Sequence, residues 1–199
     1  MRKAILHLKK ADPVLARIIE TVGPCQMQYH EPDFGTLTRS IIFQQLSGRV
    51  ARVIFERVAA ATTLTPEGML TLTPDQMRGC GLSGQKSRYL RDLAERTAAG
   101  ELKFESLASL TDQEVITHLT QVKGVGVWTS HMFLIFALRR PDVLPTGDLG
   151  IQTAMKRAYR MRQLPKPARM EKVAAPWRPW CSVASWYLWR SLENGGAAL

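Results

Sequence analysis

Apolar residues recur along much of the chain at the spacing of one helix face. Between residues 34 and 58 they stand three or four positions apart, at Leu37, Ile41, Ile42, Leu46, Val50, Val53 and Ile54. This spacing predicts one long amphipathic helix over 34–58. No segment alternates apolar and polar residues long enough to indicate a strand. The pattern therefore predicts an all-α fold.

Several predicted helices begin with a capping residue. Thr65 and Thr73 are each followed by proline and an acidic residue, the order of an N-cap, a first helical position and a first turn. Thr111 and Glu114 have the spacing of a capping box. Asp12 precedes a proline and predicts the start of a further helix.

Two glycines interrupt the pattern before a helix predicted over about residues 128–138. Gly124 and Gly126 flank Val125, and glycine tolerates positive φ and the close approach of another backbone. The amides of this tripeptide would lie at the N-terminus of the helix, where N–H groups and the helix dipole attract phosphate. By itself, the tripeptide is equally compatible with a helix corner in which the glycines serve packing only.

A single acidic residue stands before the next predicted helix. Asp148 lies 22 residues after Gly126, and the helix is predicted to begin near Leu149. An aspartate in this position is a good N-cap. The helix dipole would also keep its carboxylate ionised.

The glycine turn with its downstream aspartate resembles the helix–hairpin–helix DNA glycosylase superfamily. Three features are most similar to the branch called 3-methyladenine DNA glycosylase II: Trp128, the Asp-Leu-Gly-Ile run at 148–151 and the Trp-Arg-Pro-Trp segment at 177–180. The resemblance extends from about residue 34 to residue 192. It implies a two-lobed helical bundle with an active-site cleft between the lobes.

The resemblance also implies how the chain is divided. Residues 1–30 and 150–199 would form one helical lobe from both termini. Residues 34–149 would form the other lobe, with the helix–hairpin–helix motif at about 114–138. The implied reaction is the hydrolysis of the N-glycosidic bond of alkylated purines flipped out of duplex DNA, the first step of base-excision repair.

Asp148 is the predicted catalytic residue. Positive charge builds on the deoxyribose as the base leaves, and a carboxylate beside the sugar can stabilise that charge and orient water. The alternative role, an N-cap, is compatible with catalysis. Asp142, in the preceding turn, is predicted to have a structural or solvent role. Trp128 stands where relatives that cut the strand have a lysine, so the enzyme is predicted to be monofunctional.

Aromatic side chains would hold the flipped base, because cationic methylated purines stack well on electron-rich rings. Trp128 and Trp189 are the predicted pocket walls. Trp186 lies on the same helical face as Trp189 and is as compatible with a core position. Met132 stands where the related enzymes often have an aromatic residue, which leaves the substrate range open.

The predicted DNA-binding residues fall into three groups. Gln45 would fill the space left by the flipped base, with Leu46 beside it. The hairpin would bind the DNA backbone, and the turn at 79–86 is either a second backbone-binding loop or a simple connector. The contacts assigned to these two turns are Gly124, Val125, Gly126 and Thr129 in the hairpin, and Gly84 and Lys86 in the second turn.

Charge agrees with an anionic partner. The net charge is +10 and the pI is near 10.0. Residues 150–199 carry nine Lys and Arg against two Glu, and therefore seven of the ten positive charges. Either this is a basic face that aids solubility, or its charges contact DNA phosphates and make binding sensitive to salt.

Composition indicates an intracellular protein, and a monomer is expected. Cys25, Cys80 and Cys181 are odd in number and far apart, which is typical of a reducing compartment. No apolar run is long enough for a signal core or a membrane span. In a bacterium, the expected location is the cytoplasm and nucleoid.

No cofactor is expected for catalysis, because the four histidines have no metal-ligand spacing. The resemblance implies a structural sodium or potassium ion, held by the backbone carbonyls of Thr120, Val122 and Val125 in the hairpin.

Two other functions remain open. A non-catalytic helix–hairpin–helix DNA-binding module would need neither Asp148 nor the pocket tryptophans. A glycosylase with AP-lyase activity would need a nucleophilic lysine in place of Trp128. The sequence does not rank 3-methyladenine, 7-methylguanine, hypoxanthine and ethenoadenine as substrates.

Overall fold

The computed structural model describes residues 1–193, and over this range it is built of helices joined by turns and loops, without strands. The predicted all-α fold is confirmed. The chain divides into two compact units. Unit 1 combines Met1–Tyr29 with the chain from Arg139 onward, and unit 2 is His30–Leu138.

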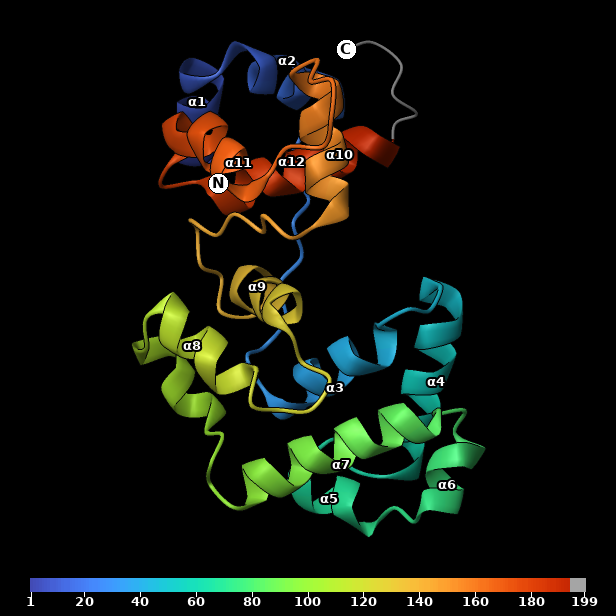
Figure 1. The fold of residues 1–199 in the computed structure, drawn as a ribbon. Coiled ribbons are helices and arrows are strands. Elements are labelled where there is room, and N and C mark those ends of the chain that lie inside the picture. Colours follow the sequence, from blue (N-terminus) through green and yellow to red (C-terminus); the bar gives the residue numbers. More distant parts are fainter. Residues whose placement is uncertain (194–199) are drawn as a thin grey trace. The chain divides into compact units, whose positions relative to one another are not determined.

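Unit 1 is built from both ends of the chain. Figure 1 shows its first two helices, drawn in blue, in the same unit as the orange and red C-terminal helices. Its elements are α1 (Arg2–Ala11), α2 (Pro13–Val22), α10 (Leu149–Ala158), α11 (Pro167–Ala174), the short 3₁₀ helix η2 (Ala175–Trp177) and α12 (Cys181–Glu193). The helix α12 packs against α1, α2 and α10. Every residue from Cys181 to Leu188 is buried, so α12 forms the centre of the core of unit 1.

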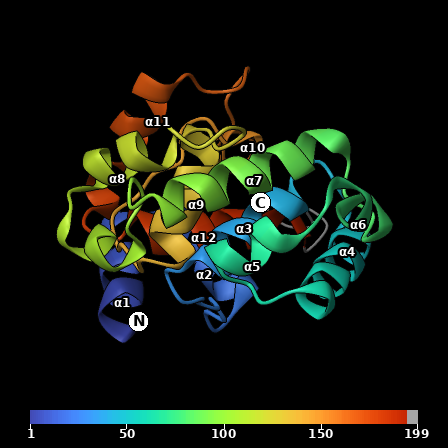
Figure 2. The same cartoon turned by 90° about the horizontal axis from the view of Figure 1, so that it is seen from below.

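Unit 2 contains the middle of the chain. Its elements are α3 (Phe34–Phe43), α4 (Gly48–Ala61), α5 (Pro66–Thr71), α6 (Pro74–Gly79), α7 (Gly84–Ala98), the 3₁₀ helix η1 (Phe104–Ser109), α8 (Asp112–Leu119) and α9 (Val127–Phe136). The long helix α7 packs against α3, α5 and α6, and Figure 2 shows it running across this group. The helices α8 and α9 pack as a pair that encloses the hairpin at 120–126.

The predicted capping residues all begin helices. The side chains of Asp12, Thr65, Thr73 and Thr111 each accept a hydrogen bond from an amide in the first turn of α2, α5, α6 and α8, respectively. At α8 the capping box is complete, because Glu114 also bonds to the backbone of Thr111. These predictions are confirmed.

The amphipathic segment predicted over 34–58 is not one continuous helix. The structure has α3 and α4, separated by a turn at residues 44–47 in which Gln45 has φ +57°. A left-handed residue cannot continue an α-helix. The apolar rhythm continues across the break, but Leu46, Val50 and Val53 are exposed, so part of the pattern does not face the core.

Residues 139–149 belong to unit 1 in the structure. The sequence-based division placed them in the lobe of residues 34–149. Ser182 of α12 explains the difference, since its hydroxyl donates to the Arg140 carbonyl at 2.6 Å and accepts from the Val143 amide at 3.0 Å. These bonds tie the connection to the core of unit 1.

Candidate functional site

Asp148 lies at the start of α10 in unit 1, and its side chain is buried, with 8% of its surface exposed. Its Oδ1 atom accepts a hydrogen bond from the Ile151 amide at 2.7 Å, which is an N-cap bond. The same oxygen accepts from the Trp189 indole Nε1 at 2.9 Å. The predicted N-cap is therefore present, and a second donor from α12 joins it on one carboxylate oxygen.

Gly150 makes room for this arrangement, and sequence reasoning missed it. A Cβ atom at position 150 would lie 3.0 Å from the Asp148 Oδ1 atom and 3.2 Å from the Trp189 Cδ1 atom. Both distances are shorter than ordinary van der Waals contact, so a side chain at this position would force the carboxylate or the indole to shift by a few tenths of an ångström. The glycine in the Asp-Leu-Gly-Ile run is the sequence feature that could have indicated this role.

The other acidic residue of this connection has the structural role predicted for it. Asp142 bonds through Oδ2 to Arg178 at 2.8 Å and through Oδ1 to the Cys181 amide at 3.3 Å, at the start of α12. Arg178 also pairs with Glu171 at 2.7 Å. The bond from Asp142, followed by that from Glu171, raises the pKa of the Arg178 guanidinium.

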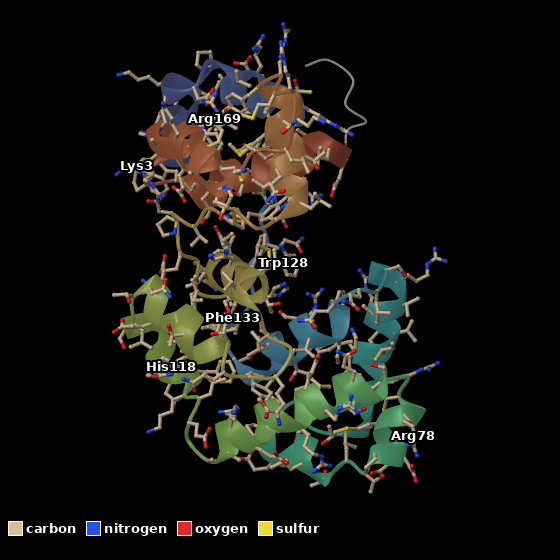
Figure 3. The ribbon with its side chains drawn as sticks, in the orientation of Figure 1. Lys3, Arg78, His118, Trp128, Phe133 and Arg169 are labelled. Carbon is tan, nitrogen blue, oxygen red and sulfur yellow. The ribbon has the colours of Figure 1, made fainter. Side chains whose placement is uncertain are left out.

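The predicted pocket residues occupy different environments. In unit 1, Trp186 is buried and packs edge-on against Tyr187 with ring centroids 5.0 Å apart, as a core tryptophan would. In unit 2, Trp128 and Met132 both lie on α9, and Trp128 is 47% exposed. Figure 3 labels Trp128 and Phe133 on α9, and Phe133 is buried. The Trp189 indole donates a hydrogen bond to the Asp148 carboxylate.

The hairpin in unit 2 is a tight turn. The Val122 amide donates to the Leu119 carbonyl at 3.1 Å, and the Val125 amide donates to the Val122 carbonyl at 3.0 Å. Gly124 has φ +79°, and a Cβ atom there would lie 2.1 Å from the Tyr89 ring. Gly124 is thus required for both its conformation and the close packing of Tyr89 beneath the turn.

Two side chains from other helices hold the hairpin. The Gln44 amide donates to the Gly124 carbonyl at 2.9 Å and to the Thr129 hydroxyl at 3.3 Å. Asp92 of α7 accepts from the Lys123 amide at 2.9 Å and pairs with the Lys123 ammonium at 3.1 Å. Burial raises the pKa of Asp92, but the bonds from Lys123 and Arg96 outweigh it, so the pKa is lowered overall. The hairpin is therefore preorganised.

Gly126 is the N-cap of α9 and supplies no side-chain acceptor to the amides at the start of the helix. A Cβ atom at position 126 would meet nothing within 4 Å. Its φ of −102° is also acceptable for other residues. By contrast, the Thr129 side chain is buried, and its hydroxyl is bonded to Gln44. Gly126 is thus the hairpin glycine that leaves an open surface at a helix N-terminus.

The two neighbouring glutamines have different environments. Gln44 faces the hairpin and bonds to it, whereas Gln45 is exposed at the apex of the turn between α3 and α4. The positive φ of Gln45 is uncommon for a residue with a side chain and marks local strain. Leu46 is exposed beside it. A strained, exposed apex is compatible with the predicted wedge.

The structure gives the Lys86 side chain a role different from the predicted phosphate contact. Its ammonium donates to the carbonyls of Ile41, Ile42 and Gln44 at 3.1, 2.5 and 2.6 Å, which caps the C-terminus of α3. An ammonium has three protons, so these bonds use its full donor capacity. Burial lowers the pKa of Lys86. The contact of Lys86 with phosphate stays a prediction.

Two arginine side chains lie beside the second glycine turn. The Arg88 guanidinium lies 3.8 Å from the Cβ position of Gly84, and the Arg57 guanidinium lies 3.9 Å from that of Gly81. Gly84 is exposed at the start of α7. The turn therefore has cations at its surface.

The hairpin carbonyls are a suitable donor set for a monovalent cation, because hard cations prefer oxygen ligands. The Val122 carbonyl already accepts the Val125 amide, and a carbonyl oxygen has a second lone pair for an ion. The oxygens of Thr120, Val122 and Val125 would hold it, and the ion would rigidify the turn. This cation stays a prediction.

Residues 1–193 contain neither a cluster of metal-ligating side chains nor a helix that could span a membrane. No group of three or more His, Cys, Asp or Glu side chains could hold a metal ion there. None of the helices in this range has the length and apolar content needed to cross a membrane.

The family model described as HhH-GPD superfamily base excision DNA repair protein matches residues 38–179. The chain therefore belongs to the HhH-GPD superfamily. The match contains the hairpin, Asp148 and Gly150, but ends before Trp189.

Within this superfamily the chain is similar to 3-methyladenine DNA glycosylases. DNA-3-methyladenine glycosylase 1 of Schizosaccharomyces pombe is 34% identical over 200 residues, which cover 96% of this chain and 87% of that one. The structure of the S. pombe 3-methyladenine DNA glycosylase in complex with abasic DNA has a TM-score of 0.85 and 33% identity, and the match covers 99% of this chain and 100% of that chain. A DNA-3-methyladenine glycosidase from Bacillus halodurans has a TM-score of 0.83 and 32% identity, with 94% and 88% covered.

Proposed function

We propose that this protein is a base-excision repair DNA glycosylase that removes alkylated purines from duplex DNA. The observation that carries the proposal is the Asp148 carboxylate, buried at a helix N-terminus and held by two donors. The names of the similar proteins support the reaction class. We further propose that it acts as an intracellular monomer.

The chemistry follows from the charge of the lesion. A purine methylated at N3 or N7 carries a positive charge, and cleavage of the C1′–N bond leaves the electron pair on the departing base, which becomes neutral. The positive charge moves to the deoxyribose. The Asp148 carboxylate stabilises this charge, and water then adds to C1′ and loses a proton. The products are a free base and an abasic site.

DNA binding is assigned to unit 2. The open N-terminus at Gly126 receives a backbone phosphate, because helix amides and the helix dipole favour an anion there. Gln45, with Leu46, fills the space left by the flipped base. The exposed indole of Trp128 is the proposed stacking surface for the base.

The reaction is assigned to hydrolysis without a covalent intermediate. The position two residues after Gly126 holds Trp128, which has no nucleophile. The nearest lysine in the sequence, Lys123, is paired with Asp92. Borohydride, which traps an imine between lysine and sugar, is expected to give no adduct with lesion DNA. An adduct abolished by mutating one lysine would establish a lyase instead.

The activity is tested with a panel of duplexes that each contain one lesion: 3-methyladenine, 7-methylguanine, hypoxanthine or ethenoadenine. Free base is measured by chromatography, and Asp148→Asn serves as the inactive control. Release of a methylated purine, with strand breaks only after alkali, is expected. Tight duplex binding without release of any base would instead identify a non-catalytic DNA-binding module.

A further inference from the structure

We propose that the Trp189 indole N–H is a positioning donor that fixes the Asp148 carboxylate, and that Gly150 is the residue that makes this contact possible. The inference rests on the proposed glycosylase function and deepens it. It assigns Trp189 a role different from the base stacking expected from the sequence, because a stacking residue acts through its ring face and needs no N–H.

The contact joins two elements that are far apart in the sequence. Asp148 begins α10 and Trp189 lies on α12, and these helices pack against each other in unit 1. The Ile151 amide and the Trp189 indole both donate to Oδ1, from the first turn of α10 and from α12. Two donors on one oxygen fix both the rotation and the tilt of the carboxylate. A fixed carboxylate avoids the reorganisation that a mobile one would need in the transition state.

Gly150 completes the arrangement. A methyl group at this position would lie 3.0 Å from Oδ1, 3.2 Å from the indole Cδ1 atom and 3.3 Å from its Nε1 atom. It would therefore separate the donor from the acceptor without removing either. The position lies inside a helix, where alanine is intrinsically better than glycine. Gly150→Ala should thus weaken the contact without weakening the helix.

Unit 1 contains a matched control for the same chemistry. The Trp177 indole donates to the Asp12 carboxylate at 2.8 Å, at the N-cap of α2. This pair likewise joins an indole N–H to an N-cap aspartate, and both of its residues are buried. Changing its donor should affect stability only.

The decisive experiment replaces the indole N–H of Trp189 by sulfur, through site-specific incorporation of 3-benzothienylalanine. The bicyclic ring and its stacking surface remain, and only the donor is lost. We expect single-turnover excision to slow about 10- to 100-fold, the effect of removing a hydrogen bond to a charged group. Affinity for abasic-site DNA should change less than about twofold, since the bond acts on the chemical step. The same replacement at Trp177 should leave the excision rate unchanged.

Gly150→Ala tests the same contact by another route. It should slow excision to a similar extent, and the combination with the Trp189 replacement should be no slower than the slower single variant, because both remove one interaction. Wild-type excision with the Trp189 replacement would overturn the proposal in favour of stacking or packing. Fully multiplicative effects of the two changes would overturn the role of Gly150.

A measurement without activity separates this proposal from the glycosylase assignment. The chain has five tryptophans, and the indole N–H resonance of Trp189 is identified by its loss in Trp189→Phe. Asp148→Ala, which removes the acceptor, should shift this resonance, whereas Asp12→Asn should shift that of Trp177. An unmoved Trp189 resonance would exclude the hydrogen bond even if excision is normal. A shifted resonance in a protein that excises no base would support the hydrogen bond between Trp189 and Asp148 and contradict the glycosylase function.

Discussion

Two helices of unit 1 begin with a buried aspartate that also accepts a hydrogen bond from a tryptophan indole, and the two indoles differ in burial. At α2, Asp12 accepts the Val14 and Leu15 amides on Oδ1, and the Tyr159 hydroxyl and Trp177 indole on Oδ2. At α10, the amide and the indole that bind Asp148 both reach Oδ1.

The difference shows what an N-cap motif does and does not determine. Asp12 is bonded through both oxygens to groups that are themselves part of the core, including Trp177, which is completely buried. Its neighbour Tyr159 has a raised pKa because of burial and then the bond to Asp12. Asp148 has the same local role, but its indole partner, Trp189, is only half-buried. We therefore assign Asp12 to stability and Asp148 to chemistry.

The exchange of aspartate for asparagine at both positions should separate these roles most strongly. In Asp148→Asn, the amide oxygen can accept both hydrogen bonds, so the cap is kept and the charge is lost. Excision should fall on the order of 100-fold or more, because the charge acts mainly in the transition state. Single-turnover rates and thermal unfolding of the same samples check this. Near-normal excision would show that Asp148 serves only as the N-cap of α10.

Asp12→Asn should have the opposite effect. One end of its amide must be NH₂, and on the Oδ2 side this group would face the Trp177 N–H, which can only donate. We expect a loss of roughly 2–3 kcal/mol in the free energy of unfolding, from a buried donor without an acceptor. Urea unfolding measures it, and the excision rate of the folded protein should stay normal. An Asp12→Asn variant that is as stable as the wild type but excises the base slowly would contradict the assignment of Asp12 to stability.

A third helix start extends the comparison, because the N-cap of α9 is Gly126 and has no side-chain acceptor. If DNA phosphate is the missing acceptor, Gly126→Ala should weaken binding to damaged and undamaged duplexes alike, by about tenfold or less. Its fold should be unchanged, since the new methyl group meets nothing within 4 Å. Gly35→Ala, in the first turn of α3, is the control, because its new methyl group makes only ordinary van der Waals contacts. Equal affinities of the two variants for DNA would show that the hairpin does not contact DNA.

The smallest expected effect concerns Asp92, the buried aspartate of unit 2. Its pKa in the folded protein is lowered below the ordinary value of 3.8. Its stabilising contribution is therefore fully present above pH 3.8 and is lost as the pH falls through the lower folded value. Between pH 5 and pH 3 the urea midpoint of the wild type should fall more than that of Asp92→Asn. Parallel curves would show that the contact with Lys123 adds no stability.

Much of the fold followed from local signals. Capping residues, prolines and acidic first turns act within one helical turn, so Asp12, Thr65, Thr73 and Thr111 indicated helix starts correctly. Periodicity alone did not predict the break after Phe43, because the apolar rhythm continues while the backbone at Gln45 turns left-handed. The same apolar residue types occur at exposed and at buried positions, and only the tertiary packing distinguishes the two.

The sequence by itself determined the family motif, the aspartate at the start of α10 and the tryptophan in place of a lysine, because these depend on residue type and spacing. The tertiary structure alone decided what the side chains bind. It directed Gln44 to the hairpin and Lys86 to the end of α3, and it placed the Trp189 indole on Asp148. Each of these bonds joins residues more than forty positions apart. No local propensity specifies such partners, since they follow from which helix faces pack together.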